Sequence, residues 1–425
     1  MKKLMILILP LFLWAESYEE VMKLIDNSLS MQSALKLQES ADMLYKSSKG
    51  ANLPKFDLSL SAVRLRETPT VIFHLPTSSY PLKAPMGTKS RYEGSMGISY
   101  PVFSGFAISS LIDKAKWQKE EARLKVLDLK RKLHIKATTL YSAVLSLKET
   151  IKAQKEALKA TVAALEKAKG LYKNGLLPPS DLYNIKAHKF ETESMILESE
   201  GKKEELLNDL GSLANKQIKD VEPFMHKREK LDKEEILKSA LKNRADILAL
   251  KSVLKTDEAD IDLAKSRYYP TIAVSAALKR KGDSLRLNGD GYTNADESYI
   301  GTQIKWNLFN GFSDRCNVEA ARLKKLSLQK RLQDYINLVK TEIDNAFLRL
   351  KTIKAKIKSA KMRLKAQEEY YRLTKGRFEN QLSSADELSR AIASLSKAKA
   401  KLAALRNELF RQEVYIKLLG GINLF

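Results

Sequence analysis

Few residues of this 425-residue chain have the types and spacing that enzymatic chemistry needs. The four histidines, His74, His134, His188 and His226, lie far apart, and none has another metal ligand at short spacing. The sequence contains no phosphate loop, nucleophile elbow or CxxC pair. Its carboxylates recur at the spacing of helix surfaces, where solvated charge is their usual role. We therefore expect a protein that is not an enzyme, with no catalytic residue, no metal site and no cofactor.

The composition describes an elongated, basic chain that must be stabilised by packing. The single cysteine, Cys316, excludes a disulfide framework, and its place in a helical pattern predicts inert packing rather than a nucleophile. The formal net charge is +24, but the lysines are scattered at helical spacing, which is typical of a solvated face. Attraction to an acidic partner or to anionic lipid headgroups is the functional alternative.

The N-terminus has the pattern of a secretory signal. Lys2 and Lys3 precede an apolar run from Leu4 to Trp14, and the small residue Ala15 follows it. At about 11 residues the run is too short to span a bilayer as a helix. Residues 1–15 are therefore predicted to be a signal peptide, and export argues against nucleic acid as a partner.

A repeated hexapeptide divides the mature chain in two. YPVFSG at Tyr100–Gly105 returns as WNLFNG at Trp306–Gly311, 206 residues later, and a long proline-free segment follows each copy. The pattern predicts an internal duplication whose unit is a helix, a pair of strands and a long helical hairpin. The expected boundaries are a first repeat at 16–215, a linker or equatorial segment at 216–235, and a second repeat at 236–425.

Four alternating apolar runs predict the strands. They lie at residues 56–62, 96–102, 272–278 and 300–308, and their lengths suit tilted membrane-crossing β-strands. Four strands cannot close a barrel, so copies of the chain would have to supply the others. A soluble sheet packed on the helices is the alternative. The proline-rich loop after Arg66 is expected to hold no paired strand. The residues predicted to face lipid are Ile272, Val274, Ile300, Ile304 and Trp306.

The long segments predict supercoiled helices. Apolar residues recur every seven positions, which indicates left-handed supercoiling. A helix from Ser104 to Gly170 would be roughly 100 Å long at about 1.5 Å per residue. The repeating positions are Val144, Ile151, Leu158, Leu165 and Tyr172, and, 206 residues later, Leu350, Ile357, Leu364, Tyr371 and Phe378.

Each long helix is predicted to end at a turn, near Gly175 in the first repeat and near Gln381 in the second. Gly175 suits a left-handed C-cap, whereas the second turn lacks both Gly and Pro and should be softer. The outgoing helices need N-terminal caps. The candidates are Ser180 or Asp181 at the first turn and Ser383, Ser384 or Asp386 at the second.

With these residues in view, the chain resembles the TolC-like outer-membrane efflux proteins over essentially all of its mature length. The duplication, the paired Phe-x-Gly junctions and the Gly-x-x-x-x-x-Asp-Leu turn at 175–182 carry the resemblance. The segment from Ala240 to Ile272 adds Arg244 and Asp246, with Ala245 in place of the family's proline, and the paired ends Leu210-Gly211 and Leu419-Gly420 also fit.

The resemblance implies a mixed α and β membrane protein of the Gram-negative outer membrane that extends into the periplasm. Three chains would form a homotrimer with a long α-helical coiled-coil barrel and a twelve-stranded transmembrane β-barrel. Such a protein would be a passive exit duct in a tripartite efflux or type I secretion system, working with a periplasmic adaptor and an inner-membrane transporter. A periplasmic adaptor and a structural coiled-coil protein of the envelope are the alternative functions.

Apolar residues exposed at a turn suggest a docking partner, although packing across the hairpin is an alternative. The predicted adaptor-docking tips are Asn174, Gly175, Leu176 and Leu177, with Asn380, Gln381, Leu382 and Ser383. The predicted periplasmic gate is Asp386, Glu387 and Arg390, in which Glu387 and Arg390 would pair in the closed duct, or form ordinary intrahelical pairs on an outward face. Arg390 also departs from the family's two acidic positions, so simple cation selectivity does not carry over.

Overall fold

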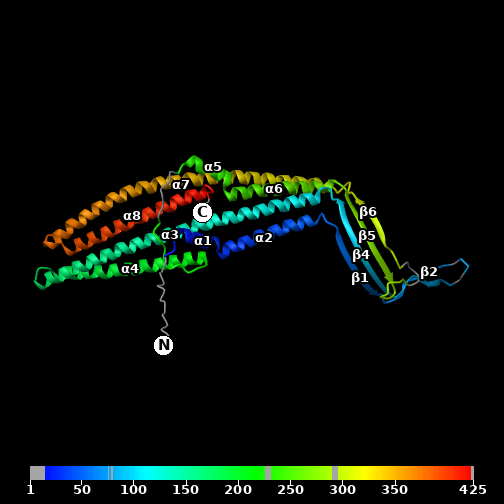
Figure 1. The fold of residues 1–425 in the computed structure, drawn as a ribbon, viewed down its shortest axis with the longest axis horizontal. Coiled ribbons are helices and arrows are strands. Elements are labelled where there is room, and N and C mark those ends of the chain that lie inside the picture. The colour runs from blue at the N-terminus through cyan, green and yellow to red at the C-terminus, as the bar shows by residue number, and fades with distance from the viewer. Residues whose placement is uncertain (1–14, 75, 78–79, 225–230, 290–294, 423–425) are drawn as a thin grey trace, which may run out of the picture. The chain divides into compact units, whose positions relative to one another are not determined.

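A computed structural model describes residues 15–74, 76–77, 80–224, 231–289 and 295–422 (Figure 1). Apart from Ala15, the predicted signal peptide lies outside the described residues, as do residues 225–230 of the predicted linker. The described chain forms two compact units. The sheet unit contains residues 39–122 and 250–331, and the helical unit contains the remaining segments.

The element order repeats helix, strands and helical hairpin, as the sequence predicts. The elements are α1 (Tyr18–Asp26), α2 (Leu29–Gly50), β1 (Lys55–Arg64), β2 (Thr70–Phe73), β3 (Leu82–Pro85), β4 (Ser90–Phe103), α3 (Ala107–Lys173), α4 (Pro179–Ala214), α5 (Lys233–Asn243), α6 (Ala245–Lys265), the 3-10 helix η1 (Ser266–Tyr268), β5 (Thr271–Gly282), β6 (Tyr299–Lys305), α7 (Ser313–Glu379) and α8 (Ala385–Leu419).

The sheet unit is built on four antiparallel strands in the order β1-β4-β5-β6. Three of the predicted alternating runs lie within strands and are confirmed. The fourth run is shorter than predicted, because β6 ends at Lys305. Trp306 therefore lies beyond the strand, where its indole Nε1 donates a hydrogen bond to the Tyr268 carbonyl at 3.1 Å. The assignment of Trp306 to a strand was wrong.

A second correction concerns the proline-rich loop, which holds a short hairpin of β2 and β3. Thr70 pairs with Pro85 and Phe73 with Leu82. The prediction failed because the prolines do not interrupt the ladder: Pro85 is the last residue of its strand, and Pro81 lies just outside it. Proline is tolerated at such strand ends, where no ladder hydrogen bond is lost.

The two Phe-x-Gly junctions adopt the same backbone. Gly105 and Gly311 have φ of 61° and 56°, and the phenylalanine after each also has positive φ, 70° at Phe106 and 61° at Phe312. At Gly105 a Cβ would lie 2.6 Å from the Ser266 carbonyl oxygen, so only glycine fits. The repeated motif thus turns the chain from strand into helix in the same way twice.

Helices α3 and α7 are each 67 residues long and have no break, which confirms the two long helical segments. They contribute to both units. They return through α4 and α8, of 36 and 35 residues. The predicted N-terminal helix is instead divided into α1 and α2 at Asn27 and Ser28. Helix α4 also continues to Ala214, so Leu210-Gly211 is not a helix end.

The core of the helical unit consists of three apolar clusters along the hairpins. One joins α1, α3, α4 and α8, a second joins α5, the start of α6, α7 and α8, and a third lies near the turns and joins both hairpins. Val144, Ile151 and Leu165 of the predicted seven-residue repeat are buried, whereas Tyr172 is exposed. Leu158 is half-buried, so the repeat predicts the α3 seam in part. In α7, Leu350 and Phe378 are buried, and Ile357, Leu364 and Tyr371 are half-buried.

The turns confirm part of the predicted capping. Gly175 has φ of 71°, the left-handed conformation expected of it. Ser384 caps α8 by accepting a hydrogen bond from the Glu387 amide at 3.2 Å. Ser180 and Asp181 do not cap α4: its N-cap is Pro178, and Pro179 is the first helical residue, where its missing N–H costs nothing.

Two further observations concern α7 and the described helices as a whole. Cys316 is exposed on α7, so the prediction of inert packing was wrong. None of the helices described in this structure combines the length and apolar character that a membrane span requires.

Candidate functional site

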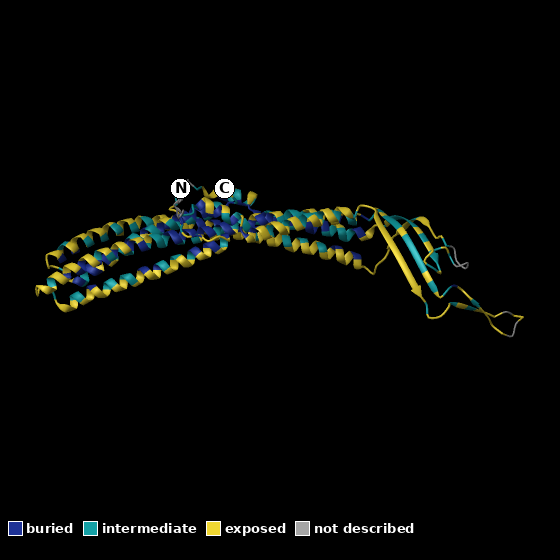
Figure 2. Ribbon diagram, turned by 60° about the horizontal axis from the view of Figure 1, so that its bottom comes forward, coloured by how far each residue is buried: buried dark blue, intermediate teal, exposed yellow. Residues whose placement is uncertain are grey.

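The strand register gathers the apolar residues of the sheet on one face. Ile272 pairs with Ile304 and Ala276 with Ile300, and paired residues share a face. The same register continues across β4 and β1, where Ile98 lies opposite both Ala276 and Phe56. Figure 2 shows how exposed these strands are. This apolar face contains Phe56, Leu58, Leu60, Met96, Ile98, Tyr100, Ile272, Val274, Ala276, Leu278, Ile300 and Ile304.

The opposite face of the sheet is polar. Ser59, Ser95 and Ser275 lie on it in neighbouring strands. Lys279 Nζ lies 3.0 Å from a carboxylate oxygen of Glu93 on β4 and 3.7 Å from one of Glu297. The predicted lipid-facing residues within strands, Ile272, Val274, Ile300 and Ile304, thus share one face, with charge and hydroxyl groups on the other.

The two helical turns form a second candidate site, at the end of the hairpins. Asn174 donates from Nδ2 to the Gly170 carbonyl at 3.0 Å, and Asn380, 206 residues later, donates to Gly376 at 2.8 Å. Leu176 and Leu382 are 55% and 76% exposed. Apolar side chains at these positions have no core to bury in within the described chain.

Leu177 differs from the other predicted tip residues because it packs on the apolar cluster near the turns. Its role is therefore packing across the hairpin, the alternative that the sequence left open for the tips. Gln381 takes a left-handed φ of 62°, at the position that corresponds to Gly175. Ser383 donates from its hydroxyl to Glu387 at 2.6 Å.

The predicted gate residues lie in the first turns of α8, but they pair differently from the expectation. Arg390 Nη2 lies 2.6 Å from Asp386 Oδ2, an i,i+4 pair, while Glu387 accepts from Ser383. The predicted pair of Glu387 and Arg390 is not formed, because Ser383 orients the Glu387 carboxylate back across the N-terminus of the helix. The ring of His188 on α4 lies 3.9 Å from Asp386, so this end of α8 also faces α4.

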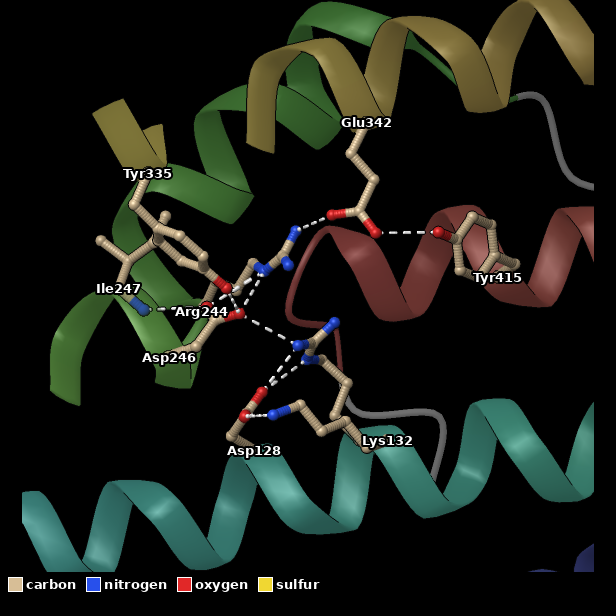
Figure 3. A network of polar contacts seen from close by, with 9 residues as sticks. Asp128, Lys132, Arg244, Asp246, Ile247, Tyr335, Glu342 and Tyr415 are labelled. Atoms are coloured by element: carbon tan, nitrogen blue, oxygen red, sulfur yellow. Dashed lines mark hydrogen bonds and ion pairs between the residues drawn. The ribbon is translucent and has the colours of Figure 1, made fainter. Parts of the chain in front are cut away.

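The most extensive polar site is a buried ion network where α5 meets α6 (Figure 3). Arg244, 3% exposed, donates from Nε to both carboxylate oxygens of Asp246 at 3.0 Å. Its Nη1 donates to Glu342 of α7 at 2.9 Å. The two residues that resemble the family's motif thus join three helices around one cation.

The network continues from Asp246 to α3. Arg131 Nη2 donates to Asp246 Oδ2 at 3.0 Å and to Asp128 at 2.6 Å. Lys132 lies 2.7 Å from the other Asp128 oxygen. Three cations and three carboxylates therefore balance, which is what a buried cluster needs to remain charged.

The pKa shifts agree with this balance. Burial opposes ionisation of Asp128, but hydrogen bonds from Lys132 and Arg131 together hold its pKa below the usual value. Burial and a hydrogen bond to Asp246 raise the pKa of Tyr335 to about 12, and burial with a bond to Glu342 does the same for Tyr415. Both phenols therefore stay protonated and donate.

A smaller polar cluster lies between α1 and α3. The buried His134 ring shares a hydrogen bond of 2.8 Å with Asp26, which also accepts from Lys130 at 2.8 Å. Burial, the largest cause, lowers the pKa of His134 despite this carboxylate. No group of three metal-ligating side chains occurs within the part of the chain that the structure describes, which leaves His226 outside.

Sequence reasoning missed these buried groups because it treated the carboxylates as solvated. The Arg-x-Asp spacing at Arg244 and Asp246 was the one available signal. No sequence signal marked Asp128, Tyr335 or Glu342, since their positions follow the same helical spacing as exposed residues. Every anion of the network has a cation or phenol as partner, so the arrangement locks helices together and leaves no free group for catalysis among these residues.

Comparison with known proteins agrees with this architecture. A family model described as outer membrane efflux protein matches residues 21–216 and 236–421. No curated protein matches significantly. The fold is similar to that of solved channels, among them Campylobacter jejuni CmeC, with a TM-score of 0.80, 17% identity and coverage of 95% of this chain and 85% of CmeC.

Vibrio cholerae VceC gives a TM-score of 0.79 at 15% identity, covering 96% of this chain and 97% of VceC. The outer-membrane channel OprN gives 0.78 at 16% identity, covering 96% and 90%. At such identities the likeness establishes the fold. The family model spans most of the sequence, and the chain belongs to the outer membrane efflux protein family.

Proposed function

We propose that the chain is the outer-membrane exit duct of a tripartite efflux or type I secretion system in a Gram-negative bacterium. Three copies would form a homotrimer in which twelve strands close one transmembrane barrel and the helical hairpins form a tunnel in the periplasm. The duct would act as a passive conduit without catalysis, recruited by a periplasmic adaptor and an inner-membrane transporter.

The observation that carries the proposal is the two-faced sheet. Its apolar face carries exposed side chains on all four strands, with Ile272, Val274 and Ala276 of β5 half-buried. Within the described chain β1 and β6 each have one unpaired edge. Open strand edges are not tolerated in lipid, so an apolar sheet of this kind calls for closure by further strands. Identical copies are the simplest source of them.

The proposal extends to the internal organisation. The two repeats, 16–215 and 236–425, would contribute equivalent strand pairs and hairpins, with 216–235 in a belt around the tunnel. The tips around Leu176 and Leu382 would dock the adaptor, and Asp386 with Arg390 would lie at the periplasmic entrance. The paired junctions at Gly105 and Gly311 support equivalence of the repeats.

Arg substitutions on the sheet test this function. Val274→Arg and Ile304→Arg place a charge on the apolar face, at a cost of about 2 to 4 kcal/mol near a bilayer midplane. We expect both to abolish heat-sensitive trimers in outer-membrane fractions on unheated gels. Ser275→Arg, on the polar face, is the matched control and should assemble. Normal trimers in both apolar-face variants would refute the barrel.

A further inference from the structure

The two helical hairpins differ sharply in charge. In the second hairpin, residues 345–367 of α7 and 388–407 of α8 contain 13 cations and no acid. The corresponding segments of the first hairpin, 139–161 and 182–201, contain six cations and six acids. Helices that face only water have no reason for such an excess, because like charges one turn apart destabilise a helix.

The α7 cations of this stretch, residues 345–367, have no ion-pair partner among the described residues. All eight are exposed. They form two columns along α7. The columns lie on either side of an apolar stripe that faces away from the buried side of the helix. The first column is Lys351, Lys354, Lys358, Lys361 and Lys365, and the second is Arg349, Lys356 and Arg363.

The stripe between the columns has the pattern of an unused coiled-coil seam. Leu348, Ala355 and Met362 recur every seven residues, and Leu348 and Met362 are 62% and 64% exposed. Buried α7 residues such as Leu350 and Ile353 lie on the other side of the helix. An apolar heptad flanked by charges is the pattern that selects a helical partner of opposite charge.

Helix α4 carries the complementary pattern. Tyr183, Phe190 and Leu197 also recur every seven residues and are each more than half exposed. The helix as a whole has eight acids and four cations. Acids flank its apolar stripe on both sides: Glu193, Glu200 and Glu204 on one, and Glu191, Glu198 and Glu205 on the other.

The two patterns match in register. Lys365, Lys358 and Lys354 precede the end of α7 at Glu379 by 14, 21 and 25 residues. Glu193, Glu200 and Glu204 follow the start of α4 at Pro179 by the same 14, 21 and 25 residues. Helix α7 ends and helix α4 begins at turns that pack in one apolar cluster, and the two helices run in opposite directions. Residues the same number of positions away from these turns therefore lie at the same level along the two helices.

We propose that α7 of one copy packs antiparallel against α4 of a second copy, and that these three Lys–Glu pairs set its register. The proposal rests on the homotrimer of the proposed function and assigns its contact. Within one chain Glu193 pairs with Lys189 and Glu200 with Lys155, and no ion pair between α4 and α7 occurs among the described residues. A contact between two different faces repeats head to tail, and it closes a ring of three where the rotation between copies is one third of a turn.

Cross-linking tests the contact directly. In a Cys316→Ser background, Lys358→Cys with Glu200→Cys should give covalent dimers and trimers with a short bismaleimide. Lys356→Cys with Glu200→Cys, which places the first thiol on the opposite flank of α7, is the matched control and should give monomer. Equal ladders from both pairs, or none from the first pair in a chain that is trimeric by native mass spectrometry, would overturn the proposal.

Charge exchange gives a second, independent measurement. Reversing Lys354, Lys358 and Lys365 to Glu should lower trimer affinity about tenfold or more at low salt, since three attractive contacts become repulsive. Adding Glu193→Lys, Glu200→Lys and Glu204→Lys should restore it. Absence of rescue would contradict the pairing. A parent chain that is monomeric in native mass spectra would instead refute the trimer of the proposed function.

Discussion

Gly175 and Gln381 hold the same left-handed backbone conformation, with φ of 71° and 62°, at the ends of α3 and α7. Leu176 and Leu382 then donate their amides back to the helix carbonyls of Leu171 and Arg377 at 2.9 and 2.8 Å. The second turn therefore keeps the geometry of the first without its glycine. A non-glycine residue in this conformation costs roughly 1 to 2 kcal/mol.

Gln381→Gly should consequently stabilise the second turn by about 1 kcal/mol, and Gly175→Ala should destabilise the first by a similar amount. Hydrogen exchange of the amides in the last turn of α7 would measure the effect locally. Gly376→Ala is the reference variant: Gly376 lies inside α7 with open space at its Cβ, so alanine should stabilise the last turn by about 1 kcal/mol through helix propensity alone. Equal exchange in parent and Gln381→Gly would show that the turn is not strained.

The comparison of these turns shows how far sequence alone could predict the fold. Spacing identified both long helices, the strand alternation and the left-handed Gly175, because each is a local pattern repeated over many residues. The prediction failed at the start of α4, where Pro178 and not Ser180 is the N-cap. It also failed at β2 and β3, where the exact positions of the prolines at the strand ends allow the strands to pair. It also failed at Trp306, whose indole is fixed by a hydrogen bond to a residue 38 positions away.

The sites were less predictable for the same reason. The ion pair of Arg131 and Asp246 joins residues 115 positions apart, and no local period encodes it. The i,i+4 pair of Arg390 with Asp386 competes with an i,i+3 alternative at Glu387, and the hydroxyl of Ser383 favours the first by holding the Glu387 carboxylate. Sequence patterns therefore predicted the helices and strands, whereas tertiary packing determines which charged side chains pair.

The buried network should be sensitive to the loss of its central cation. Arg244→Ala would leave Asp246 and Glu342 with fewer partners in a buried site, and removal of one member of such a pair costs about 3 to 5 kcal/mol. Arg244→Lys should recover only part, since it cannot donate to both carboxylates in the same fork geometry. Thermal unfolding of the purified protein would measure both.

Arg372→Ala is a matched control for Arg244, because it removes an arginine from an ion pair with Glu369 in which both side chains are exposed. We expect it to change stability by at most about 1 kcal/mol. Equal effects of Arg244→Ala and Arg372→Ala would contradict a structural role of the network.

His134 should make stability depend on pH. Burial holds its pKa below the usual value, so the unfolded chain takes up a proton near pH 6.5 while the folded chain does not. Stability is therefore full above about pH 6.5 and falls as pH drops from there toward the folded pKa, by up to about 1.4 kcal/mol per pH unit.

Denaturant unfolding between pH 5 and 7 would measure this slope. His134→Gln, which can still donate to Asp26, should remove it, whereas His188→Gln at the partly exposed position on α4 should keep it. An unchanged slope in His134→Gln would assign the pH dependence to other groups.

The exposed tips should be needed for function but not for assembly. Leu176→Asp places a charge where the side chain is solvated, so we expect trimers to reach the outer membrane while drug or cargo efflux is lost. Gly175→Pro differs, because proline cannot keep the left-handed φ of 71° and should distort the turn itself. Leu177→Asp is the contrasting variant: it buries a charge in the apolar cluster near the turns and should reduce the amount of folded protein. Loss of trimers in Leu176→Asp would make that side chain structural.

The start of α8, the proposed entrance of the duct, gives the last prediction. Arg390 neutralises Asp386 at 2.6 Å, close to the start of α8, where Glu387 and the ring of His188 also lie. In a trimer three copies of these charges would surround one axis, and removal of Arg390 would leave acids that repel each other. Arg390→Glu should therefore give a leakier, more cation-selective channel in planar bilayers.

Asp386→Asn should shift selectivity toward anions, since it leaves Arg390 without its carboxylate. Arg322→Glu, a like change on an exposed part of α7 outside the proposed contact, controls for general charge. If Arg390→Glu matched the parent in both conductance and selectivity, the pair of Asp386 and Arg390 would be an ordinary helix-surface contact.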